Sequence, residues 1–191
     1  MSLLFVTNNA HKVKEVATLL HNKYELLSLQ DLQIEEEIPE THDTLRENAI
    51  EKAIFIYTKY GYDCFADDSG LEIDALDGRP GVFSARYAGE HCTFADNVKM
   101  VLDEMQGISN RKARFRTVIA LVEKGIVYTF NGEVEGEIIE FERGTQGFGY
   151  DPIFLPLGFR QTFAEMPLSL KNSISHRARA LKQFIQFLDA R

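Results

Sequence analysis

The stretch ARFRTVIALV, residues Ala113–Val122, decides the fold together with the stretch IVYTFNGEVEGEIIEF, residues Ile126–Phe141. In the first stretch, charged or polar residues alternate with apolar ones and then give way to apolar residues alone, which is typical of a β-strand. Lys124-Gly125 lies between the two stretches and predicts a hairpin turn, whereas Asn131-Gly132 is either a second turn or a bulge within a long strand. Because a purely parallel, doubly wound sheet has no place for such a hairpin, we expect a mixed α/β fold.

Outward from this hairpin, strand and helix patterns alternate along the chain. The predicted strands, besides the hairpin, are Leu3–Thr7, Tyr24–Leu29, Cys64–Ala66, Leu71–Ala75 and Pro152–Leu155. The helices predicted from apolar spacing and caps are His11–His21, Thr44 to about Tyr60, Thr93 or Asp96 to Met105, and a last helix capped by Ser175. No linker or repeat interrupts this order, and a length of 191 residues suits a single domain spanning residues 1–191.

Composition and charge exclude several classes of function. The formal net charge of −8 argues against binding to nucleic acid, which requires a basic surface. No apolar run approaches the roughly 18–20 residues of a membrane span, and the N-terminus enters a strand pattern without a signal peptide. Cys64 and Cys92 lack the spacing of a zinc motif and are expected to be reduced thiols. We therefore expect a cytoplasmic protein with no membrane and no nucleic-acid partner.

Two adjacent carboxylates, Asp67 and Asp68, follow an apolar segment and precede Ser69-Gly70. Carboxylates are rarely buried unless they are paired or bind a metal ion, and two neighbours repel each other. A divalent cation between or beside them would explain the pattern, because hard cations take oxygen ligands. Asp-Asp-Ser-Gly also has the residues of an ordinary turn. The run therefore predicts either a cation site or a turn.

A second polar segment, Thr7-Asn8-Asn9-Ala10-His11-Lys12, joins the first predicted strand to the first helix. Such a junction presents free backbone N–H groups and a helix dipole, which suit phosphate, and Lys12 adds a positive charge. The glycine patterns of the P-loop and of dinucleotide-binding folds are both absent. An ordinary strand-to-helix turn with an asparagine cap is the alternative.

Three further groups carry candidate chemistry. Glycines on both sides of Phe148 would let its ring serve as a stacking surface, with Asp151 as an acceptor for a base edge; a glycine turn around a core phenylalanine is the alternative. Lys171 precedes the pair His176-Arg177 at a predicted helix N-terminus, where cations oppose the helix dipole and an anionic or keto-bearing ligand would explain them. Taken alone, Glu40 and Lys52 predict no more than charged side chains exposed to solvent.

Together these segments resemble the inosine triphosphate pyrophosphatase family, which hydrolyses nonstandard purine nucleoside triphosphates. The motifs that carry the resemblance are Ala66–Leu71, Pro80–Tyr87, Phe148–Pro152 and Ser175–Arg177, in the family's order and at similar spacing. The resemblance extends from Leu3 to about Leu188. It implies a mixed α/β fold with two lobes around a long mixed sheet, a central cleft, and a homodimer.

The resemblance also implies a site and a reaction. Glu40 and Asp68 would bind Mg²⁺, with Asp68 also acting as general base and Lys52 close to the phosphates. The residues implied to hold the triphosphate are Thr7, Asn8, Asn9 and Lys12. The other implied substrate contacts are Ser69, Phe148, Gly149, Tyr150, Asp151, Lys171, His176 and Arg177, with Phe148 stacked on the purine. The family commonly has glycine where this chain has Asn8, whose side chain either narrows the backbone approach to phosphate or adds a donor.

The implied reaction is attack of water on the α-phosphorus, which gives a nucleoside monophosphate and pyrophosphate. Two alternatives stay open at this point. One is a related nucleotide pyrophosphatase with a different base preference. The other is a nucleotide-binding protein without catalytic activity.

Overall fold

The computed structural model describes residues 2–20 and 24–190, which contain six strands and five α-helices. The strands are β1 (Ser2–Val6), β2 (Glu25–Ser28), β3 (Cys64–Ile73), β4 (Lys112–Glu123), β5 (Ile126–Ile138) and β6 (Phe154–Pro156). The helices are α1 (Ala10–Leu20), α2 (Leu45–Tyr60), α3 (Phe94–Glu104), α4 (Leu168–Ile174) and α5 (His176–Asp189). None of the helices in these ranges has the length and apolar character needed to cross a membrane.

All six strands belong to one sheet, in the order β2-β1-β3-β4-β5-β6. Strand β1 pairs in parallel with β2 and β3, whereas β5 and β6 pair antiparallel. The turn between β4 and β5 has both residues in the left-handed region, with φ of 50° at Lys124 and 77° at Gly125. Two positive φ values are those of the turns that favour hairpins. The mixed α/β class predicted from the central hairpin is therefore confirmed.

The chain folds into two compact units. Unit 1 comprises Met1–Asp68, Thr117–Gly132 and Arg177–Arg191, and unit 2 comprises Ser69–Arg116 and Glu133–His176. Strands β3, β4 and β5 each contribute residues to both units.

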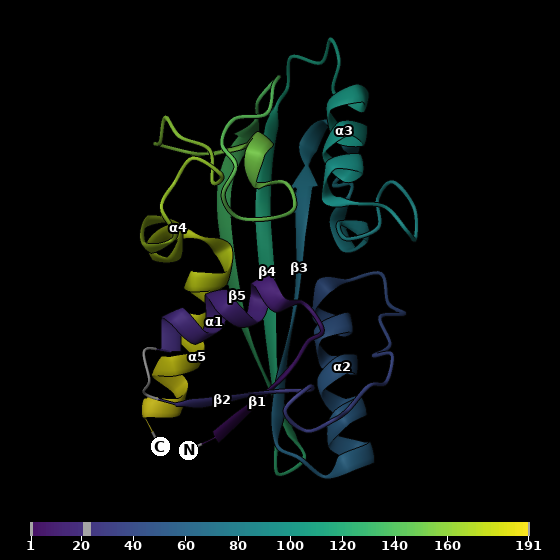
Figure 1. The fold of residues 1–191 in the computed structure, drawn as a ribbon, viewed down its shortest axis with the longest axis vertical. Helices are drawn as coiled ribbons and strands as arrows, with labels where there is room; N and C mark the ends of the chain where they lie inside the picture. The colour runs from purple at the N-terminus through teal and green to yellow at the C-terminus, as the bar shows by residue number, and fades with distance from the viewer. Residues whose placement is uncertain (1, 21–23, 191) are drawn as a thin grey trace. The chain divides into compact units, whose positions relative to one another are not determined.

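In unit 1, helices cover both faces of the strands. Figure 1 shows α1 and α5 on one side and α2 on the other. The alternation of side chains along β1 and β3 explains this arrangement. Phe5 and Phe65 stack at 4.6 Å and join a cluster with residues of α1 and α5. Cys64 points to the other face, where its thiol donates to the carbonyl of Ala53 in α2.

In unit 2, the core forms between α3 and the parts of β3, β4, β5 and β6 that belong to this unit. Leu71 and Ile73 from β3 belong to the same buried cluster as Val98 and Val101 from α3. Phe154 in β6 packs edge-on against Phe115 in β4, with ring centroids 4.7 Å apart. This cluster supports the irregular segment that carries Phe148.

Three predictions of local structure hold closely. Helix α2 begins after Thr44, whose hydroxyl accepts from the backbone N–H of Glu47 at 3.1 Å. Helix α3 begins after Thr93 with a complete capping box to Asp96. Helix α1 follows the predicted range, but its predicted last residue, His21, lies outside the described residues.

Other predictions need correction. The turn predicted as one reading of residues 67–70 is wrong, because β3 runs unbroken from Cys64 to Ile73. Strand β5 ends at Ile138 rather than Phe141, and the short strand predicted at Pro152 begins at Phe154 after a 3₁₀ turn. Helix α4 was not predicted, and its C-cap is Ser175, directly before α5.

Candidate active site

The two adjacent carboxylates point to opposite faces of β3, because side chains alternate along a strand. Asp67 shares a face with Phe65, and Asp68 shares the other with Cys64. Both carboxylates are buried, with 2% and 6% of their surfaces exposed. The cations within hydrogen-bonding distance differ between the two, Lys12 and Arg177 for Asp67 and Lys52 for Asp68.

Asp67 faces α1 and α5. One carboxylate oxygen accepts from Lys12 Nζ at 2.9 Å, and the other accepts from Arg177 Nε at 3.1 Å. Burial alone would raise the pKa of Asp67, but the charges of Lys12 and Arg177 hold that pKa well below its usual range. For Lys12, burial outweighs the attraction of Asp67 and lowers the pKa of the ammonium. Asp67 is therefore an ionised, fully paired group.

Asp68 faces α2, together with Glu40. Lys52 Nζ lies 2.5 Å from Glu40 Oε1 and 3.4 Å from Asp68 Oδ1, and the amide of Asn48 donates to Asp68 Oδ2 at 3.4 Å. Burial raises the pKa of Asp68, outweighing the charge of Lys52. Burial would lower the pKa of Lys52, but the combined charges of Asp68, Glu40 and Asp67 raise it. Unit 1 thus brings Glu40, Lys52 and Asp68 together, as the resemblance implies.

The polar turn before α1 uses its side chains to start the helix. Asn9 Oδ1 accepts from the backbone N–H groups of His11 and Lys12, at 3.0 and 3.2 Å. Thr7 Oγ1 in turn accepts from the backbone N–H of Asn9 at 3.2 Å, and Asn8 is exposed. The asparagine cap considered for this turn is therefore present. It leaves the Lys12 ammonium beside Asp67, next to the point where Val6 at the end of β1 pairs with Ala66 of β3.

In unit 2, Phe148 is held by two charged neighbours. One oxygen of Asp151, Oδ2, accepts from the backbone N–H of Phe148 at 2.9 Å and from Lys171 Nζ at 2.6 Å. The same ammonium lies 4.9 Å from the centre of the Phe148 ring, a cation–π distance, and Phe94 packs beside the ring at 6.0 Å. Asp151 and Lys171 are each 3% exposed, whereas Phe148 is only partly buried. The ring is therefore held in place by neighbours on several elements of unit 2 while it stays partly exposed.

Gly147 is what allows Asp151 to reach back to this loop. A Cβ at residue 147 would lie 2.0 Å from Asp151 Oδ2 and 2.9 Å from its Cγ, and the backbone there has a left-handed φ of +77°. Gly149 has a φ of +61° with no atom near a Cβ position. The two glycines therefore differ. Gly147 leaves room for a carboxylate, whereas only the left-handed backbone conformation favours glycine at residue 149.

The remaining predicted residues occupy different places. His176 is buried and stacks on Phe115 at 4.7 Å, within unit 2. Tyr150 is buried and donates its hydroxyl to the carbonyl of Ser84 at 2.9 Å, while Ser69 is half-buried next to Asp68. Arg177 lies in unit 1, 2% exposed, and its guanidinium binds Asp67 and Glu15. Their proposed contacts with a substrate stay predictions.

Two polar residues escaped the sequence analysis. Asn48 in α2 is 1% exposed and ties the backbone of His42 to Asp68. Glu15 in α1 is 5% exposed and pairs with Arg177. Glu15 lies off the side of α1 that carries Val13, Val16 and Leu20, so the apolar spacing gave no signal that this carboxylate would be buried.

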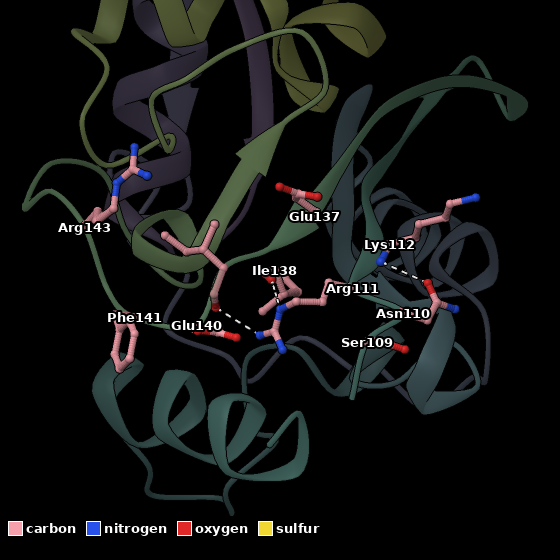
Figure 2. Close-up of a pocket in the computed structure, with 10 residues that line it drawn as sticks. Ser109, Asn110, Arg111, Lys112, Glu137, Ile138, Glu140, Phe141 and Arg143 are labelled. Atoms are coloured by element: carbon pink, nitrogen blue, oxygen red, sulfur yellow. Dashed lines mark hydrogen bonds between the residues drawn. The ribbon is translucent and has the colours of Figure 1, made fainter. Parts of the chain in front are cut away.

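A separate hollow of about 630 Å³ opens on unit 2 (Figure 2). It is lined by Ser109, Asn110, Arg111, Lys112, Glu137, Ile138, Ile139, Glu140, Phe141 and Arg143. Arg111 donates hydrogen bonds from its guanidinium to main-chain carbonyls, including those of Met105 at 3.1 Å and Ile139 at 3.1 Å. No residue implied by the resemblance lines this hollow, so it is not part of the candidate site.

Comparison with known proteins relates the chain to one family. Residues 3–187 match the model of the Ham1 family. A dITP/XTP pyrophosphatase of Flavobacterium johnsoniae is 51% identical over 190 residues, covering 100% of this chain and 99% of that protein. A dITP/XTP pyrophosphatase of Porphyromonas gingivalis is 49% identical over 187 residues, covering 97% and 96%.

Solved structures give the same relationship. A HAM1 protein from Coxiella burnetii superposes with a TM-score of 0.92 at 38% identity and covers 100% of both chains. A nucleoside-triphosphatase / dITP/XTP pyrophosphatase from Mycobacterium abscessus has a TM-score of 0.78 at 40% identity, covering 96% of this chain and 98% of that one.

Proposed function

Because the chain belongs to the Ham1 family, we propose that it hydrolyses nonstandard purine nucleoside triphosphates, such as ITP, dITP and XTP, to the monophosphate and pyrophosphate. The relatives named dITP/XTP pyrophosphatase support this substrate class over nearly the full length of the chain. The observation that carries the chemistry is that Glu40 and Asp68 both face Lys52 within unit 1. In this proposal the two carboxylates bind a cation and accept a proton, and the neighbouring ammonium of Lys52 attracts phosphate.

The acidic pair fits Mg²⁺ by the chemistry of its donors. Mg²⁺ takes oxygen ligands and usually uses only one or two carboxylates, with water and substrate phosphates completing its coordination. Glu40 and Asp68 already face one positive charge, and residues 2–20 and 24–190 hold no cluster of three or more potential protein ligands. We propose that these two residues hold Mg²⁺, which when bound neutralises phosphate charge and lowers the pKa of a bound water.

Asp68 is proposed to take the proton from the water that attacks the α-phosphorus. The bond from that phosphorus to the bridging oxygen then breaks, and pyrophosphate leaves. Burial raises the pKa of Asp68, which brings the carboxylate closer to the operating pH and makes it a better base. General-base help is typically worth ~10²–10⁴ in rate. Positioning and charge from Lys12 and Lys52 supply part of the remainder.

The triphosphate is proposed to lie at the turn before α1. The Asn9 cap already accepts from the backbone N–H groups of His11 and Lys12, so the side chains of this turn, including the amide of Asn9, are the proposed phosphate donors. Thr7 and Asn8 offer further donors beside it. Lys12 contributes a positive charge that Asp67 holds in place.

The purine is proposed to stack on Phe148. Inosine and xanthine carry a keto oxygen at the 6-position, and Lys171, His176 and Arg177 are proposed to donate hydrogen bonds to it. Adenine carries an amino donor there, which cannot accept a hydrogen bond from these residues, and sites built on specific hydrogen bonds discriminate strongly. Ser69, Gly149, Tyr150 and Asp151 are proposed to complete the substrate contacts.

We also propose that the protein forms a homodimer in the cytoplasm. Each chain is proposed to be one domain of two lobes, with the site in a cleft. These features rest on the family resemblance. Sedimentation of the purified protein gives the oligomeric state directly, and a monomer at micromolar concentration would contradict the dimer.

Product analysis tests the function. The protein is incubated with Mg²⁺ and a panel of purine and pyrimidine triphosphates, and the products are separated. Pyrophosphate from ITP, dITP and XTP, but not from ATP, is the expected result. Turnover of another base would favour the related pyrophosphatase with a different preference, orthophosphate would indicate a different bond, and absence of product would favour a binding protein without activity.

A further inference from the structure

Phe94 in unit 2 exposes a second aromatic ring beside Phe148. The two ring centroids lie 6.0 Å apart, within the range of aromatic rings in contact, and the ring planes are tilted by 47°. Phe94 is 43% exposed, and Phe148 is partly buried. The two rings therefore form an aromatic corner, part of which faces solvent.

The start of α3 fixes the position of Phe94. Phe94 is the first residue of the helix, directly after the capping box of Thr93 and Asp96. In this box the N–H of Thr93 donates to Asp96 Oδ2 at 2.7 Å, and the N–H of Asp96 donates to Thr93 Oγ1 at 3.2 Å. Asn97 follows, 1% exposed, and its side-chain oxygen accepts from the backbone N–H of Ala88 at 2.8 Å. The backbone that carries the ring is therefore held on both sides.

The core of unit 2 does not account for this ring. The side of α3 that meets the buried cluster carries Val98, Val101 and Leu102, and Phe94 lies outside that cluster. Single apolar side chains are common on protein surfaces. Phe94 differs from them because its ring adjoins Phe148 and so enlarges the surface on which a base is proposed to stack.

A purine is larger than one phenyl ring. Its two fused rings, laid flat on Phe148, extend beyond the edge of that ring. Because the corner is tilted, such a base would meet Phe94 at an angle, and aromatic rings favour tilted contacts as well as offset stacking. The Phe94 side chain has no polar atom, whereas Lys171 brings an ammonium to 4.9 Å from the centre of the Phe148 ring. Phe94 would therefore add affinity for the base without a hydrogen bond to any of its edges.

We propose that Phe94 is a second contact for the purine, beside Phe148, and that it strengthens binding of the base and not of the triphosphate. This inference rests on the proposed function, because it takes Phe148 as the stacking surface. A residue that only supported Phe148 would lose its influence once that ring is removed. A residue that touches the base keeps its influence.

The first test compares two ligands by titration calorimetry in buffer with Mg²⁺. Inosine monophosphate carries the base, and inorganic triphosphate does not. We expect Phe94→Ala to bind inosine monophosphate roughly twofold to tenfold more weakly, the worth of one aromatic contact, and to bind inorganic triphosphate as the wild-type protein does. The loss should persist when Phe148→Ala is also present. Phe159→Ala, at a phenylalanine of unit 2 that is 37% exposed, is the matched control and should change neither affinity.

The second test uses fluorescence. The sequence contains no tryptophan, so Phe94→Trp introduces the protein's single indole. Inosine monophosphate should change the emission of this indole, and inorganic triphosphate should not. Phe159→Trp is the control and should respond to neither ligand.

The outcomes separate a base contact from a structural role. Unchanged binding of inosine monophosphate in Phe94→Ala would overturn the proposal, and so would a loss that disappears in the Phe148→Ala background. Equal weakening for inorganic triphosphate would also overturn it, because this result indicates general loosening of the fold. If Phe94→Ala does not fold, Phe94→Leu, which keeps an apolar side chain without a ring, enters the same titrations and is judged in the same way.

Neither test requires turnover, so this inference and the proposed function can fail separately. Hydrolysis of ITP together with unchanged binding of inosine monophosphate in Phe94→Ala would overturn the inference alone. The expected loss of binding in a protein that hydrolyses no triphosphate would support the base contact and count against the proposed reaction. A wild-type protein that binds no inosine monophosphate would overturn both the base contact and the proposed stacking on Phe148.

Discussion

Replacing Gly147 with alanine tests how Phe148 is held. The added Cβ would lie 2.0 Å from Asp151 Oδ2, 2.9 Å from its Cγ and 3.3 Å from its Cβ. The whole carboxyl group must therefore move, although it is 3% exposed and binds both Phe148 N–H and Lys171. The expected result is loss of stability together with loss of the fixed stacking surface.

The magnitude has two parts. A left-handed φ costs a non-glycine residue roughly 1–2 kcal/mol. Separating the buried pair of Asp151 and Lys171 leaves an uncompensated charge, which costs about 3–5 kcal/mol. Together these terms approach the whole stability of a marginal domain, about 5–15 kcal/mol.

Gly158→Ala separates the two parts. Gly158 also lies in unit 2, with a φ of +85° and no atom near a Cβ position, so its replacement carries the backbone cost alone. The free energies of unfolding of both variants are measured by urea denaturation, and the KM for ITP is measured where they fold. We expect Gly147→Ala to be less stable than Gly158→Ala by about 3 kcal/mol or more. Equal stability, within about 0.5 kcal/mol, would refute the placement of the Asp151 carboxylate against Gly147.

Three further predictions concern the proposed chemistry and its charges. Asp68→Asn should abolish turnover of ITP while calorimetry still detects nucleotide binding; a variant that still turns over would remove the general-base role. Phe148→Ala should raise the KM for ITP about threefold to tenfold, the worth of one aromatic stack, and an unchanged KM would remove the stacking surface. The pKa of Asp67 is lower in the folded state than in the unfolded state. The ionised carboxylate therefore stabilises the fold above its usual pKa of about 3.9, and this stabilisation is lost as the pH falls. In urea denaturation, the free energy of unfolding of the wild-type protein should therefore exceed that of Asp67→Asn by less below about pH 4 than above it. A difference that is constant with pH would contradict this pairing.

Local signals predicted much of the fold. Thr44 and Thr93 cap α2 and α3 as expected, because a cap depends on residues three positions apart and needs no tertiary context. The turn at Lys124-Gly125 set the hairpin, and the hairpin set the class of the sheet. Helix α4 was missed because its seven residues are fewer than an isolated helix needs, so packing and not periodicity specifies it.

The candidate site was predicted less completely, because its partners come from distant parts of the sequence. The carboxylate of Asp67 was recognised as needing a positive neighbour, but nothing local indicates that Lys12 and Arg177 supply it from 55 and 110 positions away. Glu15 was passed over for the same reason. A buried carboxylate in a helix is visible only once the helix has been placed against the sheet.

The continuity of β3 explains why two adjacent aspartates can serve different purposes. A turn would have let both carboxylates face one side, where they would share their surroundings. In a strand, Asp67 faces α1 and α5 and Asp68 faces α2, so the two carboxylates have different hydrogen-bond partners. The pKa of Asp67 falls because two cations bind it, and that of Asp68 rises because burial outweighs its partners. Exchanging the roles would require exchanging the two helical layers, so neither aspartate can substitute for its neighbour.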